Sequence, residues 1–282
     1  MDPAQPIPLN DLPKFSPWPA RLLGQTHFAA RQRTSDEVLR EYDREKWGRV
    51  LDALKAGADV SAEELYRLQG VDPEKPIAFA RGDELYIAPA RLVFEEEQEL
   101  FASTLRQYPS RILAELGSGL GDKLLAMAAR FAPQRIWGGE FTASGVECGR
   151  LLASKRGIEA EFARFDYLNP ETVLRVPENA LVYTSHSVEQ IPSLSEAFVD
   201  ALILRAPQTV IHFEPCYETH EETTLLGLMR RRYTEVNDYN RNLFGLLRSF
   251  ERRGRIRILD FRKNVLGGVP LNPTSILIWQ PA

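Results

Sequence analysis

The fold is decided by the stretch Glu115-Leu116-Gly117-Ser118-Gly119-Leu120-Gly121. An apolar run typical of a buried strand, residues 112–116, leads into it, and a segment with helical spacing, residues 122–131, follows it. Glycines at a strand-to-helix turn let the backbone bend sharply and let a ligand approach the main chain. We therefore expect a cofactor to bind at this turn, with a purely structural turn as the alternative.

The spacing of the glycines distinguishes between cofactors. A dinucleotide fingerprint, G-x-G-x-x-G, would place its third glycine where this chain has Asp122. Here the third glycine, Gly121, comes one residue earlier, and Glu115 precedes the first glycine by two positions. A nicotinamide-dependent oxidoreductase is therefore a less favoured alternative.

Short apolar runs alternate with helical segments on both sides of the turn. The expected strands cover residues 112–116, 135–139, 161–165, 180–184 and 209–213, with helices at 122–131, 144–155 and 192–204. This alternation implies parallel strands joined by helical crossovers. Two further strands, 255–261 and 274–279, follow a long helical region, 220–253, and have no helix between them. We expect a doubly wound, seven-stranded, mainly parallel α/β sheet that ends in an antiparallel hairpin.

The first 110 residues follow a different pattern. A Pro-rich start, to about Ser35, indicates an extended arm. Helical spacing follows from Ser35, which can cap its helix, to Ala56, then from the capping box at Ser61, and over residues 89–107. We expect residues 1–110 to form an N-terminal arm and helical cap, and residues 111–282 to form the cofactor-binding catalytic domain.

The glycine motif resembles the first motif of the class I S-adenosylmethionine-dependent methyltransferases, acid-x-Gly-x-Gly-x-Gly. Glu140 closes the second strand, where such enzymes carry an acid that binds the ribose hydroxyls. Asp166 ends the third strand, where they carry an acid that binds the adenine amino group. The closing hairpin is also similar to theirs. The resemblance implies a Rossmann-like fold, S-adenosyl-L-methionine as cofactor, and methyl transfer as the reaction.

The same resemblance implies a set of cofactor contacts at the glycine turn and the following strand ends. These are Glu115, Gly117, Ser118, Gly119, Gly121, Glu140, Phe141, Phe165, Asp166, Tyr167, Thr184 and Ser185. Among them, we expect Phe141, Phe165 and Tyr167 to sandwich the adenine ring.

The methyl acceptor should bind where the fourth and fifth strands end. His186 follows the fourth strand and is the general-base candidate, because an imidazole takes up a proton near neutral pH. Glu189 and Glu214, one after each strand, suit a cationic acceptor through charge-assisted hydrogen bonds. We narrowly favour a basic nitrogen, in an amine or guanidino group, over a hydroxyl activated by His186. The alternative for each carboxylate is that it caps a following helix.

Candidate acceptor contacts also come from outside the strand ends. They are Tyr42 in the N-terminal helical part, Tyr217 after the fifth strand, and Tyr239 and Asn240 in the long helical region. The resemblance implies a lid, because these enzymes commonly cover the cofactor with segments outside the sheet. We expect the acceptor to be a small polar metabolite.

Composition and charge argue against several other classes of protein. The chain has 282 residues and a net charge of -4, which does not favour a general nucleic-acid binder. Its 2 cysteines lack Cys-x-x-Cys spacing and its histidines and acids do not cluster, so neither a disulfide framework nor a metal site is predicted. No signal-peptide pattern or run of ~20 apolar residues is present. We expect a cytoplasmic monomer or homodimer with no membrane partner; a non-catalytic cofactor-binding subunit is a further alternative.

Overall fold

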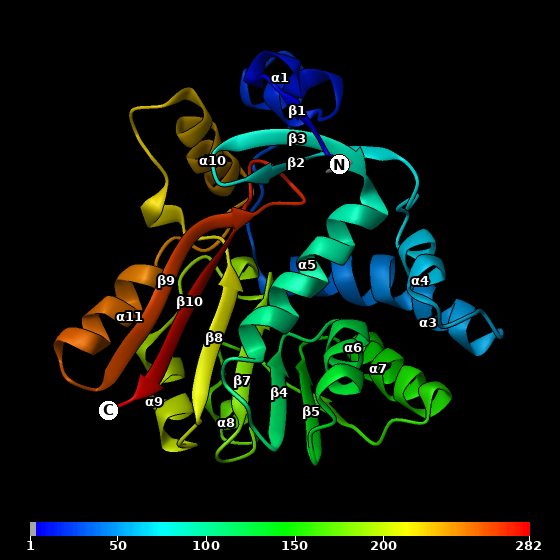
Figure 1. The fold of residues 1–282 in the computed structure, drawn as a ribbon, viewed down its shortest axis with the longest axis vertical. Helices are drawn as coiled ribbons and strands as arrows, with labels where there is room; N and C mark the ends of the chain where they lie inside the picture. The colour runs from blue at the N-terminus through cyan, green and yellow to red at the C-terminus, as the bar shows by residue number, and fades with distance from the viewer. Residues whose placement is uncertain (1–3) are drawn as a thin grey trace.

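Parallel strands joined by helices dominate the second part of the chain in the computed structural model, which describes residues 4–282 (Figure 1). Within these residues the large sheet has the strand order β6-β5-β4-β7-β8-β10-β9. Its strands are β4 (Ile112–Leu116), β5 (Arg135–Glu140), β6 (Glu161–Arg164), β7 (Leu181–Ser185), β8 (Thr209–Glu214), β9 (Ile256–Leu266) and β10 (Thr274–Pro281). β10 pairs antiparallel with β8 and β9, and the other neighbours pair parallel. The predicted sheet and its closing hairpin are confirmed.

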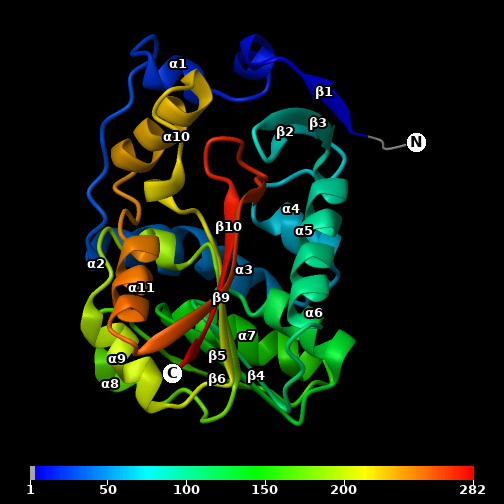
Figure 2. The same cartoon turned by 60° about the vertical axis from the view of Figure 1, so that its left-hand side comes forward.

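Helices cover both faces of this sheet, as Figures 1 and 2 show. They are α5 (Ala90–Leu105), α6 (Asp122–Phe131), α7 (Ala143–Arg156), α8 (Pro170–Val173), α9 (Glu196–Leu204) and α11 (Leu243–Arg252). The helix α10 (Leu225–Val236) lies beside the cap instead, where its buried residues pack in a separate apolar cluster. One apolar core joins α5, α6 and α7 to the sheet, and a second joins α8, α9 and α11 to the opposite face. The long helical region expected over 220–253 is divided into α10 and α11, with Asp238 between them in a left-handed conformation.

The cap begins with short helical segments and a strand. They are β1 (Gln5–Ile7), η1 (Leu9–Lys14), α1 (Trp18–Leu22), α2 (Ser35–Val38), the π-helical η2 (Leu39–Trp47), α3 (Gly48–Lys55) and α4 (Ala62–Leu68). The hydroxyl of Thr34, rather than that of Ser35, caps the first long helical stretch by accepting from the Glu37 N–H at 3.2 Å. Ser61 caps α4 as expected. Residues 1–3 of the expected arm lie outside the described residues.

A small sheet in the cap is not part of the sequence-based expectation. It consists of β1, β2 (Pro76–Arg81) and β3 (Glu84–Pro89), paired antiparallel in the order β1-β3-β2. An isolated bridge between Ala80 and Gly267 joins it to the loop of the closing hairpin. Figure 1 shows these cap elements beyond the carboxyl ends of the parallel strands. None of the helices within residues 4–282 is long and apolar enough to cross a membrane.

The glycine turn joins β4 to α6 through left-handed backbone at Gly117, Gly119 and Gly121, with φ of 71°, 54° and 79°. Residues with a Cβ adopt this conformation only with strain. The N–H groups of Gly117 and Ser118 donate to the carbonyl oxygen of Gly139 at 2.7 and 2.9 Å. The turn is therefore tied to the end of β5, and a Cβ on Gly121 would lie 2.5 Å from the Phe162 ring.

Replacing Gly121 with alanine should destabilise the protein by about 2–5 kcal/mol, the sum of left-handed strain and crowding against Phe162. Gly157→Ala is the matched control, because Gly157 is also left-handed but has open space where the Cβ would stand. The control should lose only about 1–2 kcal/mol, the strain alone. Urea unfolding measures both values, and equal losses would contradict the close packing of the turn.

Candidate functional site

Segments from distant parts of the chain converge on the glycine turn. A Cβ on Gly117 would lie 2.2 Å from the Cβ of Ser187, which follows β7. A Cβ on Gly119 would lie 3.3 Å from the ring of Trp47 at the end of η2. The cap and the loop after β7 therefore both approach the turn where it has no side chains.

Glu140 lies at the end of β5, next to the turn, and is 6% exposed. Its Oε2 accepts from the Gly119 N–H at 2.9 Å, and its Oε1 accepts from the N–H and hydroxyl of Thr142 at 2.9 and 2.7 Å. Burial raises the pKa of Glu140 despite these donors. A buried carboxylate is therefore fixed at the position expected for ribose recognition.

The residues around the turn fit a ligand that carries vicinal hydroxyl groups. Glu140 supplies two acceptor oxygens, and the buried Ser118 hydroxyl has no hydrogen-bond partner among the described residues. Asp166 lies half-buried after β6, where its Oδ1 accepts from the Leu168 N–H at 2.8 Å. Phe141 is also half-buried at this edge. The arrangement suits the adenosine part of S-adenosylmethionine.

Other expected cofactor contacts lie in the core instead. Phe165 and Tyr167 pack edge to face with ring centroids 4.8 Å apart, and the Tyr167 hydroxyl donates to the Leu116 carbonyl oxygen at 2.8 Å. Thr184 is fully buried and shares a hydrogen bond of 3.1 Å with His212. Both aromatic side chains belong to the apolar core on one face of the sheet, so they do not sandwich a ligand.

Charged and polar side chains link β4, β7 and α5. The Tyr183 hydroxyl donates to Glu115 Oε2 at 3.0 Å, and burial raises the pKa of Glu115 to about 8. Nearby, Lys123 Nζ donates to Ser185 Oγ at 3.3 Å and pairs with Glu97 Oε2 at 3.0 Å. Sequence reasoning overlooked Glu97 and Lys123, although Lys123 stands two residues after the glycine motif.

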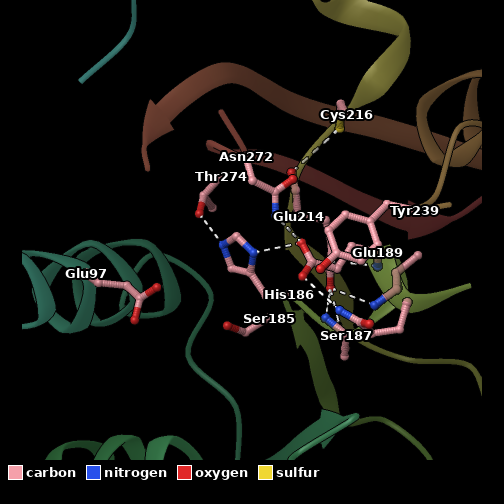
Figure 3. A network of polar contacts seen from close by, with 12 residues as sticks. Glu97, Ser185, His186, Ser187, Glu189, Glu214, Cys216, Tyr239, Asn272 and Thr274 are labelled. Atoms are coloured by element: carbon pink, nitrogen blue, oxygen red, sulfur yellow. Dashed lines mark hydrogen bonds and ion pairs between the residues drawn. The ribbon is translucent and has the colours of Figure 1, made fainter. Parts of the chain in front are cut away.

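His186 directly follows β7 and has a left-handed φ of 50°. Its Nδ1 lies 3.0 Å from Glu189 Oε2 and its Nε2 lies 2.7 Å from Thr274 Oγ1 (Figure 3). Because an ionised carboxylate only accepts, we assign the proton of the neutral ring to Nδ1, which leaves Nε2 as the basic nitrogen. Burial alone would lower the pKa of His186, but Glu189 outweighs it and the pKa is raised.

Glu189 is held on its other side by amides. Its Oε2 also accepts from Asn272 Nδ2 at 2.7 Å, and its Oε1 accepts from Gln190 Nε2 at 2.9 Å. The carboxylate therefore lies at the centre of a polar network with His186, which Figure 3 shows.

Glu214 differs from the expectation of a second carboxylate facing the acceptor. It is 1% exposed, and it accepts from the N–H groups of Ser187 at 3.0 Å, Val188 at 3.1 Å and Glu189 at 3.3 Å. These groups begin η3 (Val188–Gln190), so Glu214 takes the capping alternative. Burial raises the pKa of Glu214 to about 6. The two carboxylates do not form a cation-binding pair.

Tyrosine side chains border Glu189 on the cap side. The rings of Tyr233 and Tyr239 lie 6.0 Å apart, and the Arg33 guanidinium donates to the Tyr239 hydroxyl at 3.3 Å. Tyr42, on η2, is half-buried. Burial raises the pKa of all three tyrosines, and the nearby charge of Glu189 adds to the effect. Figure 3 shows Tyr239 beside Glu189, but Tyr233 and Tyr239 are buried in an apolar cluster of the cap, and only Tyr42 of the three keeps partial exposure.

The other expected acceptor contacts have structural partners elsewhere. The Tyr217 hydroxyl donates to Glu235 at 2.9 Å and accepts from Arg231 at 3.0 Å. Asn240 is 4% exposed; its Nδ2 donates to the Ile191 carbonyl oxygen at 2.7 Å and its Oδ1 accepts from the Leu243 N–H at the start of α11. These side chains position loops and do not face the site.

Two further observations concern metal binding and the surface of the cap. Residues 4–282 contain no group of three or more His, Cys, Asp or Glu side chains placed to share a metal ion. A surface hollow of about 560 Å³ runs along the cap, lined by Thr34, Asp36, Glu37, Leu39, Arg40 and Arg44. None of the candidate cofactor or acceptor residues lines this hollow.

Comparison with known proteins supports the fold. No family model and no curated protein matches the chain. The crystal structure of magnesium protoporphyrin IX methyltransferase from Synechocystis PCC 6803, with bound S-adenosylhomocysteine, superposes with a TM-score of 0.53 at 12% identity, covering 88% of this chain and 100% of that chain. The chain has the class I methyltransferase fold. The small RNA methyltransferase HEN1 superposes with a TM-score of 0.50 at 13% identity, over 70% of this chain and 28% of that chain.

Glu115→Gln should remove part of the pH dependence of stability. Folding raises the pKa of Glu115 from 4.5 to about 8, so the folded state binds an extra proton between these values and stability falls as the pH rises through them. The glutamine variant lacks this titration but can still accept from Tyr183. Its stability relative to the native protein should therefore increase from about pH 5 to about pH 8, by up to several kcal/mol, and then level off. Urea unfolding across this range checks the trend, which a constant difference would contradict.

Proposed function

We propose that the chain is an S-adenosylmethionine-dependent methyltransferase that methylates a hydroxyl group of a small molecule, with His186 as the general base. The shared fold and the glycine turn beside Glu140 support the cofactor. One observation carries the choice of a hydroxyl: the His186 ring is oriented by Glu189 and keeps 26% of its side-chain exposure at the end of β7.

The adenosine part of the cofactor is assigned to the turn and the adjoining strand ends. The Glu140 carboxylate would accept from the ribose hydroxyls, and Asp166 would accept from the adenine amino group. Ser187 and the Trp47 ring approach Gly117 and Gly119, so the loop after β7 and the cap would both border the bound cofactor. When bound, S-adenosylmethionine supplies an electrophilic methyl group on a sulfonium.

In the proposed reaction, His186 takes the proton from the acceptor hydroxyl as the hydroxyl oxygen attacks the methyl group. Nε2 accepts this proton, while Nδ1–H stays hydrogen-bonded to Glu189, whose charge stabilises the imidazolium that forms. In the structure the Thr274 hydroxyl is the partner of Nε2 at 2.7 Å, so the acceptor hydroxyl would replace it there. Glu189 thus orients the base and makes it stronger.

A basic nitrogen as acceptor loses support because Glu214 is occupied by backbone N–H groups. The fixed position of Glu189 against His186 and Asn272 leaves it less free to bind a cation. The half-buried ring of Tyr42 in the cap would instead suit an apolar or aromatic part of a small molecule. HEN1 is a small RNA methyltransferase, but the net charge of -4 on this chain favours a small acceptor over RNA.

Replacing His186 with alanine should lower kcat by about 10²- to 10⁴-fold, because general-base catalysis contributes that much. Binding of S-adenosylhomocysteine should stay unchanged. The assay follows formation of S-adenosylhomocysteine with a panel of hydroxylated aromatic compounds. His27→Ala, at an exposed histidine of the cap, is the control and should retain activity. If His186→Ala stays active while Glu189→Gln is inactive, the hydroxyl proposal fails and a cationic acceptor is favoured.

The pH profile of Glu189→Gln tests how the base is tuned. The neutral imidazole is the active form, so kcat/KM should fall as the pH drops through the raised pKa of His186. Removing the carboxylate charge lowers that pKa. The acidic limb of the profile should therefore move to lower pH in Glu189→Gln, and an unmoved limb would contradict the assigned role of Glu189.

A further inference from the structure

A charged pair lies beside the glycine turn, outside the proton path of His186. Lys123, in the first turn of α6, places its Nζ 3.0 Å from Glu97 Oε2 on α5 and donates to Ser185 Oγ at 3.3 Å. The side chains of Lys123 and Glu97 keep 33% and 21% exposure. Figure 3 shows Glu97 projecting from its helix toward the side on which Ser185 and His186 lie. The pair therefore borders the accessible end of β7.

Both members of the pair carry their charge at neutral pH. Burial alone would raise the pKa of Glu97, but the charges of Lys123 and His186 outweigh it and the pKa is lowered. Burial alone would lower the pKa of Lys123, but Glu97 and the further acids Asp122 and Glu115 outweigh it and the pKa is raised. A positive and a negative charge thus stand next to each other at the site.

The order of the strands places this pair at one end of the cofactor. Neighbouring strands run β6, β5, β4 and β7. Asp166 follows β6, Glu140 ends β5, and the glycine turn follows β4, while Ser185 ends β7. A cofactor with its adenine at Asp166 and its ribose at Glu140 would extend its other end toward Ser185 and Lys123.

That other end of S-adenosylmethionine is an α-amino acid with a carboxylate and an ammonium group. We infer that Lys123 binds the carboxylate and Glu97 the ammonium, so that the pair is a recognition site for the amino-acid zwitterion. This inference rests on the proposed function. Charge-assisted hydrogen bonds on both groups would orient the sulfonium methyl toward the end of β7.

A simpler role for the pair would be to hold α5 against α6. The chain contains a direct comparison, because Arg130 Nη1 on α6 lies 2.9 Å from Glu99 Oε2 on α5. Its side chains are 38% and 61% exposed, and it is more solvated than the Lys123 pair. The Arg130–Glu99 pair has no contact with Ser185 among the described interactions, so it provides the matched control.

The test compares two ligands by titration calorimetry. S-adenosylhomocysteine carries the amino acid, whereas 5′-methylthioadenosine keeps the adenosine and sulfur but lacks it. The double variant Lys123→Met/Glu97→Gln removes both charges together and leaves no unpaired charge. It should bind S-adenosylhomocysteine about 10- to 100-fold more weakly than the native protein and 5′-methylthioadenosine within about threefold of it.

The control variant Arg130→Met/Glu99→Gln should leave both affinities unchanged, and circular dichroism verifies that each variant is folded. A second variant, Lys123→Glu/Glu97→Lys, keeps an ion pair between the helices but exchanges its charges. It should also lose the preference for S-adenosylhomocysteine. If either Lys123 variant keeps the native preference, or the native protein binds both ligands equally, the zwitterion site is overturned. If neither ligand binds the native protein, the proposed function fails with it.

Discussion

The glycine turn has no room for a Cβ at Gly117 or Gly121 and little at Gly119, and the rest of the site depends on this constraint. Ser187 approaches Gly117, Trp47 approaches Gly119, and the Phe162 ring approaches Gly121. These neighbours belong to the loop after β7, the cap and the strand β6. The same turn therefore positions the loop after β7, the cap and β6 relative to one another. Its close contacts are also the reason why the pattern of glycines is so informative in the sequence.

A second backbone turn, at the start of η3, positions His186 and Glu189. The Glu214 carboxylate satisfies consecutive N–H groups at the start of η3, directly after His186. That arrangement supports the left-handed backbone of His186 and brings Glu189 back toward its ring. Glu214 acts only through this turn, so it is a positioning residue, whereas His186 is the residue that would touch the acceptor. Glu214 is buried as a cap, so Glu189 is the carboxylate that orients the imidazole of His186.

The parts of the structure that follow local rules could be predicted from the sequence. The alternation of strands and helices, the glycine turn and the position of Glu140 at a strand end depend on nearby residues. The place of β1 could not be predicted, because it pairs with a strand about 80 residues later in the chain. The strands β2 and β3 form a hairpin across Gly82-Asp83, a local signal that the sequence analysis overlooked. Phe165 and Tyr167 pack in the apolar core on one face of the sheet, opposite to Phe162, and this packing against other elements could not be predicted from their position after a strand. The partners of Glu214 and Lys123 come from other elements, so only packing could reveal them.

The acceptor and zwitterion sites both depend on one assignment, in which the glycine turn and Glu140 hold the adenosine part of S-adenosylmethionine. Calorimetric titration of S-adenosylhomocysteine into the native protein and Glu140→Gln is the decisive experiment. The native protein should bind one molecule per chain, and Glu140→Gln, while remaining folded, should bind about 10- to 100-fold more weakly, because a charged acceptor for the ribose hydroxyls is lost. No binding to the native protein, or equal binding by both proteins, would contradict the assignment.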